Sequence, residues 1–161
     1  KYTLNHDRPD SIGKMKAFCI ALSDETALGD FYVSGIEQGG SGHMFGEDLN
    51  FNLRPKHSSL IQGSVCFRLD DLIQKYVLPV PNHIKIDVDG LEHKILDGSV
   101  DTIANDNVKS VLVELNTNLE VHRKIVSHMK NFGFSLDQGQ VKASIVKEGW
   151  NAGIGNHIFR R

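Results

Sequence analysis

The sequence has little cysteine, a single tryptophan and no long apolar run. Its two cysteines, Cys19 and Cys66, lie far apart in apolar segments, and neither has a CxxC partner or a cysteine–histidine cluster nearby. This excludes a disulfide framework and predicts two buried free thiols, as in a reducing compartment. No apolar run approaches the roughly 18–20 residues needed to cross a bilayer, and the polar opening KYTLNHDRPD is unlike a signal peptide. We therefore expect a cytoplasmic protein with no membrane contact.

An excess of charge of one sign is also missing. The 161 residues include 20 acidic and 18 basic side chains, for a net charge of −2. No global field attracts a polyanion, so we expect no nucleic-acid partner. A hydrophobic content of 40% is typical of a folded globular chain. The length favours one domain spanning residues 1–161.

Short apolar runs alternate with helical periodicities, which predicts an α/β fold with a mostly parallel sheet and antiparallel strands at its C-terminal edge. Polar, glycine-containing residues 35–62 predict a long loop or insertion, of the kind that is functional or mobile. The predicted helices are 69–77, 91–95 and 119–129. The predicted strands are 16–22, 31–33, 64–69, 83–88, 108–115, 134–138, 141–146 and 156–161.

The densest chemical signal is the segment IKIDVDGLE at residues 84–92. An apolar strand ends in Asp87, Asp89 and Gly90 follow, and Glu92 falls in the first turn of the next helix. In doubly wound sheets, ligands bind outside the carboxyl ends of the strands. Asp87 is the strongest candidate, because a carboxylate at the end of an apolar strand carries a desolvation cost and needs a partner. Glu92 has a second explanation, because an acid there complements the helix dipole.

Several interpretations of this segment compete. A calcium loop is excluded, because aligning Gly90 with that loop's glycine places Lys85 first and Leu96 twelfth, where acids are required. Asp87 and Asp89 also resemble the Asp-x-Asp metal and nucleotide-sugar site of certain glycosyltransferases. A purely structural turn explains Asp89 and Gly90 as local geometry. The remaining interpretation is a methyl-transfer site.

Three segments together resemble the FkbM family of S-adenosylmethionine-dependent methyltransferases. They are LDDL at 69–72, IKIDVDGLEHKILDGS at 84–99, and the strand VLVELN that contains Glu114. FCIALSDE, FYVS and Asn5, which would lie in a helix tail, agree more loosely. Asp89 stands where the family most often has glutamate, which keeps the charge and shortens the reach. The resemblance covers residues 1–137.

The resemblance implies a Rossmann-like class I methyltransferase fold, here incomplete at its N-terminus, because no glycine-rich cofactor turn is present. It implies S-adenosylmethionine as cofactor and O-methylation of a hydroxyl on a sugar or natural-product acceptor. Asp87 is the candidate base for the hydroxyl proton. The implied cofactor-binding residues are Ala21, Leu22, Ser23 and Asp87. The implied acceptor-binding residues are Asp89, Glu92 and Glu114.

Two alternatives stay open, a fragment of an Asp-x-Asp glycosyltransferase and a non-catalytic Rossmann-like module. No HxxxH or HExxH occurs, so we expect no metal site and histidines scattered at or near the surface. We expect Trp150 to anchor a C-terminal hairpin rather than cap an acceptor pocket, and Arg160 and Arg161 to form a solvated terminus. The glycine-rich segment 39–46 is expected to face substrate. Exposed sheet edges predict a homodimer.

Overall fold

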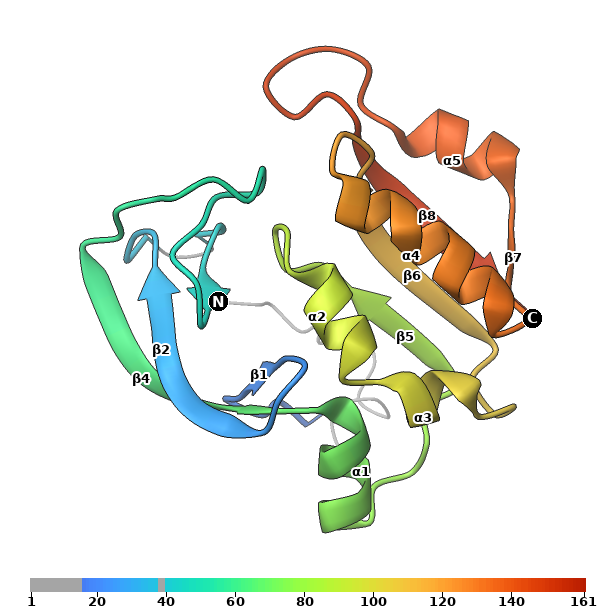
Figure 1. The fold of residues 1–161 in the computed structure, drawn as a ribbon, viewed down its shortest axis with the longest axis horizontal. Coiled ribbons are helices and arrows are strands. Elements are labelled where there is room, and N and C mark those ends of the chain that lie inside the picture. Colours follow the sequence, from blue (N-terminus) through green and yellow to red (C-terminus); the bar gives the residue numbers. More distant parts are fainter. Residues whose placement is uncertain (1–15, 38–39) are drawn as a thin grey trace, which may run out of the picture.

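The computed structural model describes residues 16–37 and 40–161, which form a mixed α/β fold with two four-stranded sheets (Figure 1). The expected helix tail at Asn5 lies outside the described residues. The first sheet contains β1 (Ala21–Leu22), β2 (Ala27–Val33), β3 (Met44–Phe45) and β4 (Leu60–Phe67). The second sheet contains β5 (His83–Ile86), β6 (Ser110–Asn116), β7 (Ser135–Leu136) and β8 (Ile154–Arg160). The helices are α1 (Leu69–Tyr76), α2 (Glu92–Asp97), α3 (Val100–Ala104), α4 (Glu120–Asn131) and α5 (Gln138–Ser144).

The strand orders are β1-β4-β2-β3 and β5-β6-β8-β7. Only the pairs β1–β4 and β5–β6 are parallel, and the other pairings among the described strands are antiparallel. The expected mostly parallel sheet is therefore wrong for this part of the chain. The reason is that β2 and β4 pair along their whole length without a crossover helix between them, and β8 inserts between β6 and β7.

The main core lies between the second sheet and the helices α2, α3 and α4 (Figure 1). Val111, Val113 and Leu115 alternate along β6 and are fully buried on the helix side. Leu112 and Glu114 alternate with them and therefore point to the opposite face. Strand 108–115 is confirmed with slightly shifted bounds, and the pleat places Glu114 on the face that carries the candidate site.

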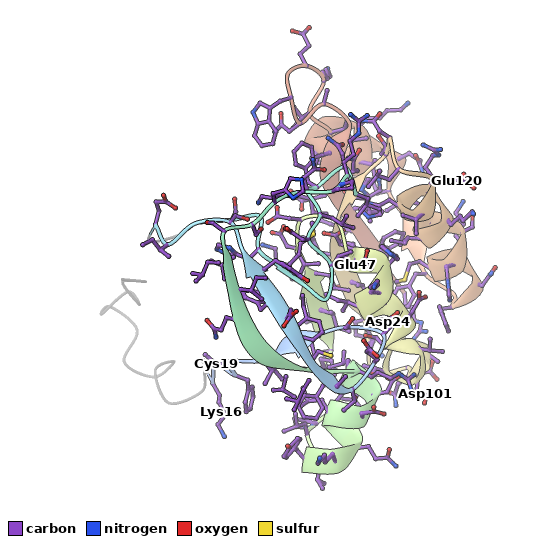
Figure 2. All side chains as sticks on the ribbon, turned by 60° about the vertical axis from the view of Figure 1, so that its left-hand side comes forward. Lys16, Cys19, Asp24, Glu47, Asp101 and Glu120 are labelled. Atoms are coloured by element: carbon purple, nitrogen blue, oxygen red, sulfur yellow. The ribbon has the colours of Figure 1, made fainter. Side chains whose placement is uncertain are left out.

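The predicted strand 16–22 shrinks to Ala21–Leu22. Among the described strands β1 pairs only with β4, so no second neighbour buries the preceding residues. Cys66 is buried as expected, but the expected burial of Cys19 is wrong, because this side chain lies at the surface (Figure 2). The predicted strand 83–88 is likewise only partly buried, because β5 is an edge strand in the described sheet.

The C-terminal region differs from expectation in one element. Residues 141–146 are predicted as a strand, but residues 141–144 belong to helix α5 and residues 145–146 follow it. The Asp137 carboxylate accepts the backbone N–H groups of Gly139 at 2.8 Å and Gln140 at 3.1 Å, which caps this helix. The predicted C-terminal hairpin is therefore replaced by a helix, a turn and β8, whereas the predicted helix at 69–77 is confirmed as α1.

The last side chain, Arg161, is not solvated as expected. Its guanidinium donates hydrogen bonds to the carbonyl oxygens of Ile103 at 2.9 Å and of Asn105 and Phe132 at 2.7 Å, and it lies 4.3 Å from the Phe134 ring centre. Its side chain is only 18% exposed. Arg161 therefore connects α3 to the end of α4.

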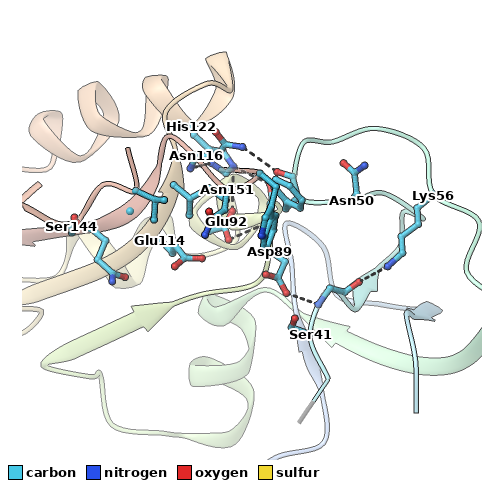
Figure 3. Close-up of a pocket in the computed structure, with 18 residues that line it drawn as sticks. Ser41, Asn50, Lys56, Asp89, Glu92, Glu114, Asn116, His122, Ser144 and Asn151 are labelled. Carbon is cyan, nitrogen blue, oxygen red and sulfur yellow. Dashed lines mark hydrogen bonds and ion pairs between the residues drawn. The ribbon is translucent and has the colours of Figure 1, made fainter. Parts of the chain in front are cut away.

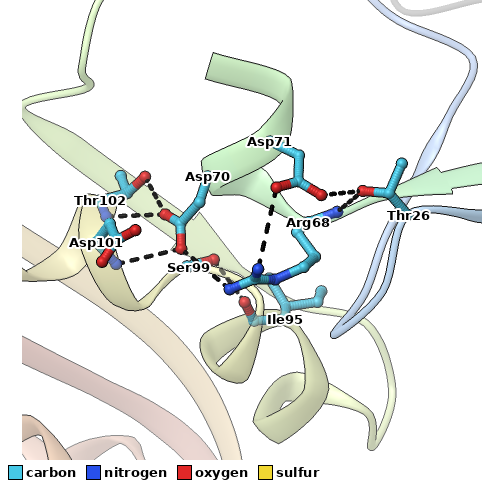
Figure 4. Close-up of polar contacts among 8 residues, drawn as sticks. All are labelled: Thr26, Arg68, Asp70, Asp71, Ile95, Ser99, Asp101 and Thr102. Atoms are coloured by element: carbon cyan, nitrogen blue, oxygen red, sulfur yellow. Dashed lines mark hydrogen bonds and ion pairs between the residues drawn. The ribbon is translucent and has the colours of Figure 1, made fainter. Parts of the chain in front are cut away.

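The two sheets are joined where α1 meets α2 and α3 (Figure 4). The Asp70 carboxylate accepts the N–H groups of Asp101 at 3.2 Å and Thr102 at 2.8 Å, which caps α3. Gly98 lies against the backbone of Ser23, and a Cβ at this position would overlap the Ser23 carbonyl oxygen. The LDDL segment and Gly98, both part of the family resemblance, therefore hold the end of β1 against the second sheet.

Candidate functional site

Two cavities lie on either side of the turn between β5 and α2, residues 87–91. The intersheet cavity, of about 740 Å³, lies between β1 and β5 and is also lined by residues 40–45. The polar cavity, of about 400 Å³, lies between this turn, residues 50–56 and the C-terminal turn (Figure 3). Ser41, Gly42 and Asp89 line both cavities and thus form the partition between them.

The residues predicted from the sequence fall into these cavities in two groups. The residues expected to bind cofactor line the intersheet cavity: Ala21, Leu22, Ser23 and Asp87. The residues expected to bind acceptor line the polar cavity: Asp89, Glu92 and Glu114. The glycine-rich segment, of which residue 39 is not described, lines both. The structure thus brings the members of each predicted group together.

Asp89 occupies an unusual backbone conformation. Its φ is +60°, in the left-handed region that aspartate tolerates better than most residues, and Gly90 follows with φ +131°. The Asp89 Oδ2 atom accepts the backbone N–H of Gly42 at 2.7 Å. This bond fastens the glycine-rich loop to the turn and fixes the partition between the two cavities.

Glu92 holds this turn from beneath. Its Oε1 atom accepts the backbone N–H groups of Val88 and Gly90, each at 3.1 Å. The residue is 1% exposed, and its Oε2 atom has no hydrogen-bond partner among the described residues. Burial raises the pKa of this carboxyl, the backbone N–H donors oppose the rise, and the Asp89 charge adds to it.

His122 completes the support of the turn. Its Nδ1 accepts the backbone N–H of Asn116 at 3.0 Å, so the ring proton is on Nε2, which donates to the Gly90 carbonyl oxygen at 3.0 Å. Glu92 Oε2 lies 3.2 Å from the same Nε2. Burial lowers the pKa of His122, so the ring is neutral at pH 7.

The expectation that the histidines lie at or near the surface is therefore wrong for His122 and His157, which are both buried. The spacing of His122 with Leu119, Ile125 and Met129 in one helical stripe is the signal that could have placed it inward.

Asp87 directly follows β5, and Glu114 lies near the end of the neighbouring parallel strand β6, so both are at the end of the sheet that faces the cavities. Asp87 is 39% exposed and pairs with Lys85 Nζ at 2.9 Å, so the expected desolvation of this carboxylate is wrong. Glu114 is half-buried. Burial raises the pKa of its carboxyl most, and repulsion from Asp87, Asp89 and Glu92 raises it further.

Trp150 lines the polar cavity, although the sequence predicted that it would anchor a C-terminal hairpin. It is 79% exposed rather than an anchor, and its ring meets Phe51 edge-on with centres 5.2 Å apart. Both rings line the polar cavity, so Trp150 covers the cavity instead of fixing a hairpin. Its position in a turn rich in glycine and asparagine, where no apolar pattern demands burial, is the sequence signal for this role.

The described residues contain no group of three or more His, Cys, Asp or Glu side chains arranged to hold a metal ion. Within the same residues, no helix combines the length and apolarity that a membrane crossing requires.

A family model described as the methyltransferase FkbM domain matches residues 3–136. The chain belongs to the FkbM methyltransferase family. Among known proteins, neither the curated sequences nor the solved structures contain a match to it. Membership of the FkbM family favours methyl transfer over the glycosyltransferase interpretation of Asp87 and Asp89.

The two cavities differ in how much of their lining belongs to the segment that matches the FkbM family model. All residues that line the intersheet cavity belong to the matched segment. The polar cavity is shared, because residues 144–156 follow the FkbM segment and supply much of its wall, including Trp150. The polar cavity, which we expect to meet the acceptor, is thus walled in part by residues outside the matched segment.

Proposed function

We propose that this chain is an S-adenosylmethionine-dependent O-methyltransferase that acts on a hydroxyl of a sugar or natural-product acceptor. The intersheet cavity would hold the cofactor and the polar cavity the acceptor. The observation that carries this proposal is the shared wall: Gly42 and Asp89 line both cavities, so two ligands would meet at this partition. Parallel β5 and β6 followed by antiparallel β8 also suit the proposed Rossmann-like class I fold.

The lining of the intersheet cavity fits the proposed cofactor. Leu22, Met44 and Ile86 offer apolar surface for an adenine ring, and Asp87 and Asp89 offer acceptors for hydroxyl and ammonium groups. A volume of about 740 Å³ lies within the range of small-molecule sites. When bound, the cofactor supplies an activated methyl group together with its leaving group.

The chain's own contribution is alignment and proton removal. The bond from Gly42 to Asp89 and the contacts of Glu92 and His122 hold the partition rigid, which orients the two ligands. We assign Asp87 as the base for an acceptor hydroxyl that reaches across the partition to the cofactor, because Asp87 lines the intersheet cavity two residues before the partition residue Asp89 and is open to a ligand. A positioned base contributes about 10²- to 10⁴-fold to the rate.

The test combines binding and turnover. Isothermal titration should show S-adenosylmethionine binding, and a panel of hydroxyl acceptors should yield S-adenosylhomocysteine. Asp87→Asn should lower turnover by about 10²-fold or more, while Asp106→Asn, at an exposed position outside both cavities, should not. Absence of cofactor binding, or full turnover by Asp87→Asn, would show the proposal to be wrong.

The homodimer stays a prediction. Among the described strands, β5 has one unpaired edge that a second chain would cover. Light scattering over a range of protein concentrations measures the oligomeric state.

A further inference from the structure

We propose that the polar cavity selects an acceptor that carries an ammonium group close to the methylated hydroxyl, as an amino sugar does, and disfavours acceptors with a carboxylate or phosphate. This inference rests on the proposed function, since it assigns the polar cavity to the acceptor. It names a charge preference, the residue that produces it, Glu114, and the residue that stacks on the ligand ring, Trp150.

The charges that line the polar cavity are mostly negative. Asp89, Glu92 and Glu114 contribute three carboxyl groups, and Lys56 is the single lysine or arginine among the lining residues. The Lys56 Nζ is already bonded to Ser34 Oγ and lies 3.4 Å from the Gly42 carbonyl oxygen. Even with Glu92 protonated, two carboxylates face one engaged ammonium group. An anionic ligand would therefore be repelled, and a cationic one attracted.

Glu114 is the carboxylate available to a ligand. Asp89 Oδ2 is committed to the Gly42 N–H, and Glu92 Oε1 to two backbone donors. No described residue donates a hydrogen bond to the Glu114 side chain, which is half-buried near Asp87, Asp89 and Glu92, with Lys85 as a weaker opposing charge. An ammonium group beside Glu114 would relieve this repulsion and form a charge-assisted hydrogen bond.

Glu92 gives an independent sign that the cavity wall lacks a donor. Its side chain is 2% exposed, yet Oε2 has no hydrogen-bond partner within residues 16–37 and 40–161, because the His122 Nε2–H is used by the Gly90 carbonyl. Buried carboxylate oxygens are normally paired. A polar ligand in the cavity would bring donors to this wall.

The aromatic pair Phe51 and Trp150 suits a ring-shaped ligand. The exposed indole offers an apolar surface on which the C–H face of a sugar ring can stack, whatever the charge of the sugar. Asn151 and Asn156 also line the cavity, and their side-chain amides can offer both donors and acceptors to hydroxyl groups. The Asn116 amide is already engaged with Phe51, Asn52 and Asn118, and the Asn50 side-chain oxygen with Asn52 and Arg54.

Three probes of similar size but different charge test the preference: glucosamine, glucose and glucuronate. Binding to the whole protein is measured by ligand-observed NMR at neutral pH and low salt. We expect glucosamine to bind about three- to tenfold more tightly than glucose, and glucuronate to bind more weakly than both. Raising the salt concentration should reduce the glucosamine advantage.

Two variants separate charge from stacking. Glu114→Gln keeps the side-chain shape and should abolish the preference of glucosamine over glucose. Trp150→Ala should weaken glucosamine and glucose alike. Glu120→Gln is the matched control, because this carboxylate pairs with Lys124 on α4 and lines neither cavity. Circular dichroism confirms that each variant is folded.

The inference is wrong if the three probes bind alike, if glucuronate binds best, if none binds at millimolar concentration, or if Glu114→Gln leaves the preference unchanged. Titration with S-adenosylmethionine distinguishes this failure from failure of the proposed function. Cofactor binding without a charge preference overturns the inference alone. A charge preference without cofactor binding overturns the proposed methyl transfer and leaves the cavity's selectivity in place.

Discussion

Replacing Gly98 by alanine tests the joint between the two sheets. A Cβ at this position would overlap the carbonyl oxygen of Ser23, and would lie 3.0 Å from the Ser23 carbonyl carbon and 3.3 Å from the Arg68 Cα. Non-bonded carbon atoms prefer separations of about 3.5–4.0 Å. All three neighbours are backbone atoms, so no side chain can rotate away. The end of β1 or the start of α1 must therefore move.

The expected loss of stability follows from this geometry. Inserting a methyl group into a filled site costs about 1–3 kcal/mol, and rigid backbone on several sides favours the upper end. Gly98 has φ −83°, which alanine adopts readily. Because alanine lowers the conformational entropy of the unfolded chain, the substitution also stabilises the folded protein by about 0.4–1 kcal/mol. The net destabilisation is about 2 kcal/mol, which lowers Tm by about 4–8 °C in a chain of this length.

Urea unfolding followed by circular dichroism measures the effect. Gly63→Ala is the matched control, because Gly63 is exposed in β4 and a Cβ there meets no atom of the described part of the chain within 4 Å. We expect this variant to stay within about 0.5 kcal/mol of wild type. If Gly98→Ala is as stable as Gly63→Ala, the close approach of Gly98 to Ser23 does not exist in solution. Because Ser23 lines the intersheet cavity, Gly98→Ala should also weaken cofactor binding under the proposed function.

The remaining predictions concern single side chains. Arg161→Ala should destabilise the protein by about 2 kcal/mol in urea unfolding, because three carbonyl oxygens lose their donor, whereas Arg160→Ala should not. An equal loss of stability in the two variants would show that the hydrogen bonds of Arg161 do not stabilise the protein. Asp137→Ala should cost about 1 kcal/mol by removing the cap of α5, and Asp137→Ser should recover much of it. Because the folded pKa of His122 is lowered, the unfolded chain binds its proton first, and stability should fall as pH drops below about 6.5. In His122→Gln, whose side chain can still accept a hydrogen bond from Asn116, stability should fall less steeply below about pH 6.5. An unchanged pH dependence would show that His122 is not the group responsible.

Local pattern predicted much of the fold. The apolar spacing of α1 and the alternating valines and leucines of β6 are complete within one segment, so neighbouring residues suffice to indicate them. The acidic turn after β5 is equally local, because the order strand, acid, glycine, helix determines where its carboxylates emerge. Residues 141–146 were one exception, because the capping side chain of Asp137 outweighed a strand-like composition.

How exposed each of these side chains is, and which groups it pairs with, depended on segments that are remote in the chain. Asp87 is open and paired with Lys85, whereas Glu92 is buried beneath the turn, and no local pattern distinguishes the two. Arg161 is enclosed because the ends of α3 and α4 meet around it.

By itself the sequence determined the FkbM family, the helices with a clear apolar stripe and the carboxylates of the candidate site, because these are properties of short segments. Only the tertiary structure decided that Gly42 and Asp89 divide two cavities, that His122 supports the turn, and that Trp150 covers the polar cavity. The physical reason is that burial and electrostatic interaction act through space, and in this molecule the residues that meet at the partition are separated by tens of positions along the chain.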